Sequence, residues 1–350
     1  MRAVATFPPV VWSGDVLRHE PGAEVWVGVR TPGTEVPQRA LVLRDAVVAG
    51  GARLVEATSY DDAVLRRVHD PGLLAHLARA HEEWMAGPYE LLVGQDRVVP
   101  YVFPTGGMLD GLPLREPAAP HARAGLYCYD TMTLVGPGTW TAARAAVDVA
   151  VSAADLVAGG ERAAYALVRP PGHHATRSAF GGSCYLNNAA AAVQRLRDTG
   201  IERVAVLDLD AHHGNGTQSI FYDRADVFYG SLHVDPGAGW FPHFAGFADE
   251  RGRGEGEGTT YNRPLRPGTG DGGWLAALDD VIARVQAFGP VALVVSLGVD
   301  AAGDDPESPL EVSTDGFRRA GERLAALGLP TVLVHEGGYQ LERLGIDTVA

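Results

Sequence analysis

The sequence contains no lysine. All 29 of its basic residues are arginine, against 43 acidic residues, which gives a net charge of −14. Without a lysine amine the chain cannot form a Schiff base, nor a phosphate-binding loop of the kind that requires lysine. The acidic balance argues against a nucleic-acid partner, because phosphate binding needs clustered positive side chains. An acidic chain attracts cations such as polyamines, although solubility alone also accounts for it.

Cysteines and long apolar runs are scarce as well. Cys128 and Cys184 are the only cysteines among 350 residues, too few for a disulfide framework, so we expect a reducing, cytoplasmic location. The sequence has no run of 18 apolar residues, and we expect neither a membrane span nor a membrane partner. The apolar stretch within residues 1–12 is short and contains two prolines, which favours a first strand over a signal peptide.

Apolar runs alternate with alanine-rich stretches along the chain. The apolar runs predict strands at 165–169, 204–209, 227–232, 291–297 and 331–335. The alanine-rich stretches predict helices at 141–158, 187–199, 273–288 and 315–327. Residues 85–125 and 251–259 are expected to be loops. This alternation predicts an α/β fold, a single domain over residues 1–350 with a mostly parallel central sheet covered by helices on both faces.

One segment, residues 207–218 (LDLDAHHGNGTQ), joins an apolar strand end to carboxylates and imidazoles. Asp210 and His212 are two positions apart, so on an extended strand end their side chains face the same side. A carboxylate with an imidazole is a ligand pair that suits zinc. A turn-capping Asp beside surface histidines is the ordinary alternative.

Four other motifs fall at the same edge of the sheet, where open α/β sheets bind ligands. They are RPPGHHA (169–175), FGGSCYLNN (180–188), SLGVD (296–300) and HEGGY (335–339). Adjacent histidines suit proton transfer near neutral pH, and glycines let the backbone approach a ligand closely. Each motif alone has a structural explanation, since a strand-end Asp such as Asp300 often caps a turn and a Tyr such as Tyr339 often lies in the core. Their joint occurrence argues against coincidence.

This ordered set of motifs resembles the zinc-dependent histone deacetylase superfamily, and within it bacterial acetylpolyamine amidohydrolases and class II deacetylase-like amidohydrolases. The similarity runs from about residue 10 to the end of the chain. The resemblance implies an arginase–deacetylase fold and a metal-dependent deacetylase, a hydrolase of linear amide bonds. The implied mechanism combines metal-activated water, two histidines as acid and base, and a tyrosine that stabilises the oxyanion.

The resemblance assigns roles to the motif residues. Asp210, His212 and Asp300 match the ligands of one zinc ion per subunit, with ferrous iron left open as the metal. His173 and His174 match the tandem catalytic histidines.

Tyr339 matches the tyrosine that hydrogen-bonds the substrate carbonyl, and Gly182 matches the glycine whose carbonyl accepts the substrate N–H. A structural potassium site is implied at Asp208, Asp210, His212, Ser231 and Leu232.

The partners of the two histidines suggest different tasks. Asp208 matches the partner of His173, and a carboxylate favours the charged imidazolium. Asn215 stands where His174 has its partner, and a neutral amide orients the ring without favouring a charge. We therefore expect His174 to be the general base and later the acid, with His173 as electrostatic support.

Departures from the common family pattern bear on the substrate. Ser183 stands where a bulky aromatic usually lines the tunnel, whereas Phe241 keeps the opposite wall. Glu307 at the pocket rim resembles the gatekeeper of polyamine-selective deacetylases, since a carboxylate pairs with an ammonium inside a polyamine; a solvated loop Glu is the alternative. Glu24 and Trp26 fall where this group places an acid and an aromatic, in a loop that helps form a homodimer.

We therefore expect a small cationic acetylated amine, most readily an N-acetylpolyamine, as the substrate, with an acyl-lysine protein deacetylase as the alternative. A two-metal ureohydrolase is less favoured, because Gly214 stands where a second metal would need a carboxylate. A non-catalytic acyl-ligand binder would be expected to lack Tyr339 or a metal ligand, and the chain has them all.

Overall fold

The computed structural model describes residues 7–350, so the first part of the predicted N-terminal strand lies outside the described residues. An eight-stranded sheet forms the centre of the molecule, with strand order β4-β1-β5-β10-β9-β6-β7-β8. Within the described chain, every pairing in this sheet is parallel. The strands are β1 (Val10–Trp12), β4 (Leu54–Glu56), β5 (Ala163–Ala166), β6 (Val204–Asp208), β7 (Val227–Val234), β8 (Thr260–Leu265), β9 (Ala292–Leu297) and β10 (Thr331–His335).

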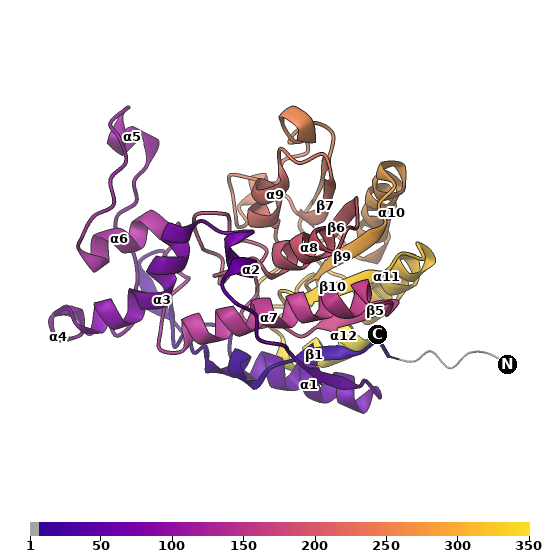
Figure 1. Ribbon diagram of the computed structural model, residues 1–350, viewed down its shortest axis with the longest axis horizontal. Helices are drawn as coiled ribbons and strands as arrows, with labels where there is room; N and C mark the ends of the chain where they lie inside the picture. Colours follow the sequence, from indigo (N-terminus) through magenta and orange to yellow (C-terminus); the bar gives the residue numbers. More distant parts are fainter. Residues whose placement is uncertain (1–6) are drawn as a thin grey trace.

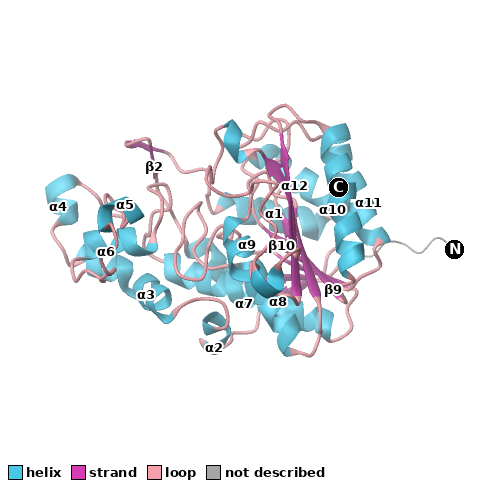
Figure 2. Ribbon diagram, turned by 90° about the horizontal axis from the view of Figure 1, so that it is seen from above, coloured by secondary structure: helices cyan, strands magenta, loops and turns pink. Residues whose placement is uncertain are grey.

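Helices cover both faces of the sheet, as the alternation of apolar and alanine-rich stretches predicted. Helices α7 (Thr139–Ala158) and α8 (Asn188–Asp198) pack together on one face. Figure 2 shows α10 (Asp271–Phe288) and α11 (Thr314–Ala326) on the other, where α12 (Leu341–Val349) packs between α11 and α1 (Gln38–Ala49). Strands β6 and β7 are buried along their whole length, which explains their continuous apolar character. Between residues 7 and 350, no helix has both the length and the apolar character to cross a membrane.

Residues 85–125 were expected to form a long loop, and this prediction was wrong where the segment forms short helices. Helix α3 (Pro71–Met85) ends where this segment begins. Three short helices follow, α4 (Tyr89–Val93), α5 (Gly106–Leu109) and α6 (Pro120–Tyr127). Proline at the first turn starts α6, and the Thr105 side chain caps α5. These helices are thus set by local capping and are too short to show a helical repeat of apolar residues in the sequence. This arm projects away from the sheet (Figure 1).

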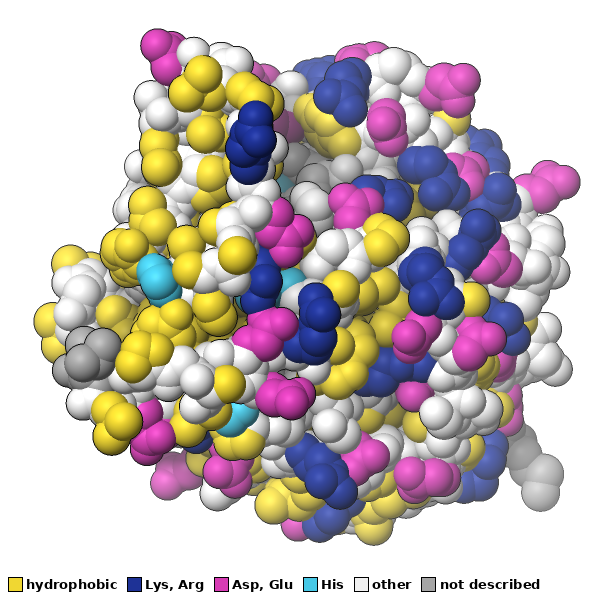
Figure 3. Space-filling model, turned by 60° about the vertical axis from the view of Figure 1, so that its left-hand side comes forward, with side chains coloured by type: hydrophobic (Ala, Val, Ile, Leu, Met, Phe, Trp, Pro, Cys, Tyr) yellow, Lys and Arg dark blue, Asp and Glu magenta, His cyan; other side chains and the backbone are white. Residues whose placement is uncertain are grey.

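The arm carries exposed apolar side chains. Leu112 is 69% exposed and Leu91 is 93% exposed. Figure 3, which brings this side of the molecule forward, shows hydrophobic side chains gathered there.

The shorter predicted loop, 251–259, holds one 3-10 turn, η3 (Gly254–Gly256). Two further short helices are α2 (Ala63–Arg66), which packs against α8, and α9 (Asn215–Phe221), which begins in the LDLDAHHGNGTQ segment. A small antiparallel hairpin, β2 (Glu24–Trp26) and β3 (Val29–Thr31), stands apart from the central sheet.

The carboxyl ends of β6, β9 and β10 meet at one edge, because these neighbouring strands are parallel and in register. Asp208 pairs with Ser296 across β6 and β9, and His335 pairs with Leu297 across β10 and β9. The polar motifs that follow these strands therefore start side by side.

Candidate active site

Three side chains from two neighbouring strand ends converge on one point. Asp210 and His212 follow β6, and Asp300 follows β9. Nδ1 of His212 lies 3.0 Å from Oδ2 of Asp300 and 3.3 Å from Oδ1 of Asp210. One ligand atom from each residue lies within 4.8 Å of the other two. The structure thus brings together the three residues that the sequence predicted as metal ligands.

Glycines make room for the two carboxylates. A Cβ atom at Gly298 would collide with the Asp210 carboxylate, and one at Gly337 would collide with those of Asp210 and Asp300. Backbone N–H groups hold one oxygen of each carboxylate, in both cases over 2.8 Å. The other oxygen of each faces His212, so the three donor groups point at a common centre.

This donor set fits a divalent metal ion. Bonds of about 2.0–2.1 Å to zinc place two ligand atoms of a tetrahedral site about 3.3 Å apart. The separations of 3.0 and 3.3 Å around His212 Nδ1 are close to that spacing. Burial, with the charge of Asp210, raises the pKa of Asp300 to about 7. A bound cation would relieve this crowding of buried negative charge.

The adjacent histidines lie beside this centre, with ring centroids 4.0 Å apart. Nδ1 of His173 faces Asp208 at 3.2 Å, whereas Nδ1 of His174 faces the side-chain oxygen of Asn215 at 2.7 Å. Burial disfavours a charge on His173, but Asp210 and Asp208 outweigh it and raise the pKa of His173 to about 10. Burial and the neighbouring histidines lower the pKa of His174 well below its usual value. The pair therefore offers one charged and one neutral imidazole.

Tyr339 borders the same space from the turn after β10. It lines a narrow inner slot together with His174 and His212. The Arg39 guanidinium lies over the tyrosine ring, with Cζ 4.6 Å from the ring centroid. The tyrosine is thus held at the slot by the turn that precedes it and by a buried cation behind its ring.

Gly182 and Ser183 form a tight turn on the facing wall. Both have positive φ, +58° and +60°, and the flanking Gly181 and Cys184 exchange two backbone hydrogen bonds of 3.1 and 3.0 Å. This is the backbone of a type I′ hairpin turn. A Cβ atom at Gly182 would collide with the ring of His174, so only glycine fits there.

The inner slot has a volume of about 70 Å³ and opens into a vestibule of about 700 Å³. Ser183 lines the slot only, whereas Phe241, Glu24 and Glu307 border both spaces. Burial raises the pKa of Glu24 to about 7; the Glu307 charge adds to this, and a hydrogen bond from the Thr34 N–H opposes it. The structure therefore brings the two predicted rim acids together.

Trp26, the aromatic residue predicted in the same early loop as Glu24, lies at the outer part of the site. It lines the vestibule but not the inner slot, and it is 62% exposed.

Of the residues predicted for potassium, Asp208 ends β6, Asp210 and His212 follow it, and Ser231 and Leu232 lie on the neighbouring strand β7. Asp208 pairs with Ser231 in the strand register, and Leu232 follows Ser231 in the core. Asp208 also accepts hydrogen bonds from the Tyr229 hydroxyl, over 3.0 Å, and from the Asp210 N–H, over 3.2 Å. This strand end is therefore rich in oxygen atoms immediately beneath Asp210.

Sequence reasoning missed several residues that hold the site through the backbone. Asp130 accepts the Gly182 N–H over 2.6 Å, and Glu336 accepts the N–H of His173 over 3.1 Å. Asp305 accepts the Tyr339 N–H over 2.6 Å. Glu336 lies inside the HEGGY motif, and Asp305 lies two residues before Glu307, so both were close to predicted site residues. Asp130 lies in none of the motifs. Such contacts need only a carboxylate at the right place, so they leave no sequence pattern.

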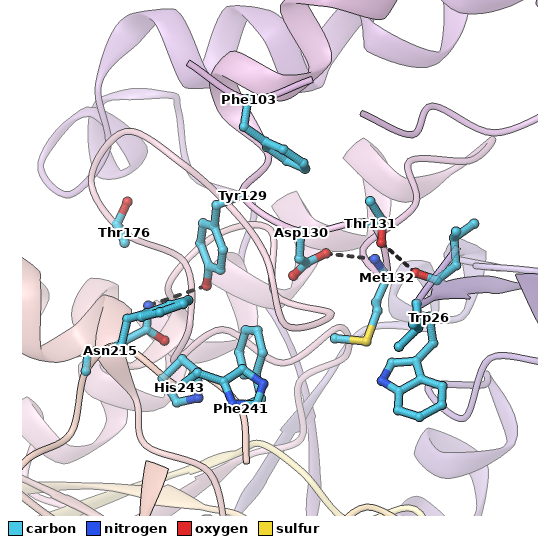
Figure 4. Close-up of a pocket in the computed structure, with 15 residues that line it drawn as sticks. Trp26, Phe103, Tyr129, Asp130, Thr131, Met132, Thr176, Asn215, Phe241 and His243 are labelled. Carbon is cyan, nitrogen blue, oxygen red and sulfur yellow. Dashed lines mark hydrogen bonds between the residues drawn. The ribbon is translucent and has the colours of Figure 1, made fainter. Parts of the chain in front are cut away.

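A second cleft, shown in Figure 4, shares Phe241 with the lining of the vestibule. It has a volume of about 480 Å³ and is lined by aromatic side chains that include Phe103 and Tyr129. The Tyr129 hydroxyl donates to the His174 carbonyl over 2.8 Å, and the Asn215 amide lies 3.5 Å from that hydroxyl. This cleft therefore backs onto the groups that orient His174.

Comparison with known sequences agrees with this geometry. Residues 34–348 match the histone deacetylase domain. The acetylpolyamine amidohydrolase of Mycoplana ramosa is 41% identical over 97% of this chain and 96% of its own length. The acetylpolyamine amidohydrolase of Burkholderia pseudomallei is 45% identical over 89% of this chain and 87% of its own.

Comparison with solved structures gives the same result. The crystal structure of an acetylpolyamine aminohydrolase from Burkholderia pseudomallei has a TM-score of 0.91 and 41% identity, covering 98% of this chain and 96% of that one. The crystal structure of the HDA15 HD domain has a TM-score of 0.77 at 28% identity, covering 97% and 88% of the two chains. The fold class and the family resemblance inferred from the motifs are confirmed.

Proposed function

Because this chain belongs to the histone deacetylase family, whose members include deacetylases and amidohydrolases, we propose that it is a zinc-dependent amidohydrolase that removes acetyl groups from N-acetylpolyamines. The observation that carries the proposal is the convergence of Asp210, His212 and Asp300 on one point at the base of a slot bordered by His174 and Tyr339. The relatives that match nearly the whole chain bear the name acetylpolyamine amidohydrolase, which supports the substrate class.

Asp210, His212 and Asp300 would hold one zinc ion per chain. When bound, the ion supplies Lewis acidity, which makes an amide carbonyl more electrophilic and a water molecule more acidic. We further propose that Asp208, Asp210, His212, Ser231 and Leu232 provide oxygen ligands for a structural potassium ion.

The protein residues move the protons. Neutral His174, oriented by Asn215, takes the proton from the attacking water and later gives it to the leaving amine nitrogen. His173 stays charged beside Asp208 and stabilises the negative charge that develops. The Tyr339 hydroxyl donates to the oxyanion, and the Gly182 carbonyl accepts the substrate N–H. The products are acetate and a free amine.

The rim gives the substrate preference. Glu24 and Glu307 would attract an ammonium group of a polyamine on its way into the slot, and a neutral chain would gain nothing from them. Ser183, small and polar, lines the same slot as Phe241 and makes that part of the lining polar. A cationic chain with polar nitrogens fits this lining better than a purely aliphatic one.

We also propose a homodimer in a reducing compartment such as the cytoplasm. The exposed apolar side chains of the projecting arm, among them Leu91 and Leu112, support an interface between two copies. Cys128 and Cys184 are buried and free, which fits reducing conditions. Sedimentation of the wild type should give a dimer, and Leu112→Glu should shift it toward monomer; a monomeric wild type would contradict the proposal.

The function is tested with purified protein and a panel of N-acetylated diamines, acetylspermidines and acetyl-lysine peptides, each with and without a chelator. We expect the highest kcat/KM with acetylpolyamines and loss of activity with the chelator. Faster turnover of lysine peptides would instead indicate a protein deacetylase. Analysis for divalent metals should give one such ion per chain; two divalent ions would favour the ureohydrolase alternative.

A further inference from the structure

The turn that carries Tyr339 is held from two opposite directions. From one side, Arg39 donates to the carbonyl oxygens of Gly338 and Glu336, each over 2.6 Å. From the other side, one oxygen of Asp305 accepts the N–H of Tyr339 over 2.6 Å and that of Gln340 over 3.1 Å. The backbone position of the tyrosine is therefore set by two buried charged groups.

The second oxygen of Asp305 holds a different part of the site. Oδ1 accepts the backbone N–H of Glu307 over 3.0 Å. Glu307 borders the inner slot and the vestibule, as does Glu24. The Asp305 carboxylate, only 7% exposed, thus bridges the tyrosine turn and the rim loop.

We propose that Asp305 is a positioning residue that fixes Tyr339 and Glu307 relative to each other, so that oxyanion stabilisation and recognition of a cationic amine both depend on it. This inference rests on the proposed function, which gives Tyr339 and Glu307 their roles. Asp305 itself touches neither the substrate nor the metal centre in this scheme.

The chemistry requires a carboxylate here. Three N–H donors converge on its two oxygens, and hydrogen bonds to a charged acceptor are stronger than neutral ones. An asparagine offers a single acceptor oxygen, so it can hold either the tyrosine turn or Glu307 but not both. An alanine holds neither.

A purely structural role is the competing explanation. Gln340 immediately precedes α12, so Asp305 also satisfies N–H groups at the start of that helix. If capping were its whole role, replacing Asp305 would lower stability and the amount of folded protein. It would leave the selectivity of the folded fraction unchanged.

Two ratios of kcat/KM separate these explanations, because neither depends on the concentration of active protein. The first compares an acetylated amine with its trifluoroacetyl analogue, whose more electrophilic carbonyl relies less on the tyrosine hydrogen bond. The second compares a cationic N-acetyldiamine with a neutral N-acetylalkylamine of equal length, which reports on the rim acid. The variants are Asp305→Ala and Asp305→Asn, with Asp304→Ala as the matched control, since Asp304 is exposed and forms only a 3.8 Å ion pair with Arg343.

In Asp305→Ala we expect both ratios to fall about ten-fold: kcat/KM of the acetylated amine relative to its trifluoroacetyl analogue, and kcat/KM of the cationic substrate relative to the neutral one. Ten-fold is about the size of one lost hydrogen bond to a charged group. Asp304→Ala should keep both ratios at the wild-type value. If Asp305→Ala does not fold, a fall in either ratio in Asp305→Asn supports the proposal. Unchanged ratios in every folded Asp305 variant, or a fall in only one ratio in Asp305→Ala, overturn it. A wild type inactive on the whole panel would instead reject the proposed function itself, and this inference with it.

Discussion

At the scale of single residues, His173 and His174 illustrate how the neighbouring groups set the charge of an imidazole ring. Their rings are neighbours, yet Asp208 faces one and Asn215 faces the other. A carboxylate oxygen stabilises an imidazolium strongly, whereas an amide oxygen does so weakly. This difference acts together with burial, with Asp210 and with the neighbouring histidines, so that only His174 is suited to accept a proton near neutral pH.

Replacing Asn215 by Asp should therefore give His174 the kind of partner that His173 has. We expect the acidic limb of the kcat/KM profile to move up by roughly one pH unit or more, because a raised pKa keeps the base protonated to higher pH. The measurement is a pH–rate profile on an N-acetyldiamine. Asn215→Ala is the control and should lower the rate without an upward shift of the limb. An unmoved limb in Asn215→Asp would exclude His174 as the base.

Glu24 gives a second pH dependence, one that acts on binding. Its pKa of about 7 means that it is protonated below that pH and charged above it. For a cationic acetylated amine, KM should therefore rise as pH falls through 7, by about ten-fold at most. Glu24→Gln should have a high KM that stays flat from pH 6 to pH 8. A neutral acetylated amine should show no such dependence in either protein, and an identical slope for both substrates would rule out this role.

At the scale of elements, sequence patterns located the central strands better than the edges. Strands β6, β7, β9 and β10 lie inside the sheet and are apolar on both faces, so each appears as a continuous run. The edge strands were not predicted. Strand β4 has only three residues, and β8 (TYNRPL) mixes polar residues with a proline that an edge position tolerates.

The residues of the candidate site also divide into those that the sequence predicted and those that it did not. The convergence of the proposed metal ligands, the histidine pair and Tyr339 could be predicted because these residues sit in short motifs at strand ends. Asp130, Asp305 and Glu336 could not be predicted, because they act on backbone N–H groups of segments far away in the sequence. Such pairings become visible only once the turns are placed.

A buried charge cluster ties several elements together behind the active site. Glu35 accepts a hydrogen bond from Arg39 of α1 over 2.9 Å and lies 2.8 Å from Nε of Arg169, three residues after β5. All three side chains are about 1% exposed. Glu35→Gln would leave two buried guanidinium groups without their counter-charge, so we expect the free energy of unfolding to fall by about 3–5 kcal/mol. Urea unfolding measures this, with exposed Glu20→Gln as a control that should change little; an unchanged midpoint in Glu35→Gln would contradict the account.

At the scale of the whole molecule, the proposed metal should contribute to stability as well as to activity. An ion that binds only the folded chain stabilises it by about 4 kcal/mol at a thousand times its Kd. Removing it with a chelator should therefore lower Tm by several degrees and abolish turnover.

Asp300→Asn provides the control for this effect. It lacks one proposed ligand, so the chelator should leave its Tm unchanged. It also relieves the repulsion that, with burial, raises the pKa of Asp300 to about 7, so the metal-free variant should be at least as stable as the metal-free wild type. An equal chelator-induced loss of Tm in both proteins would show that the ion acts elsewhere.

The spread of the donor set along the chain has a consequence for how the molecule is made. His212 and Asp300 are separated by 88 residues, and Tyr339 comes later still. A nascent polypeptide halted before position 300 has only two of the three proposed donors, and the turn after β10, which supplies the Gly337 amide beside them, has not yet been translated. Capture of the proposed ion is thereby deferred until this turn has been translated, and a product truncated before position 300 should emerge as an apo species without hydrolytic activity.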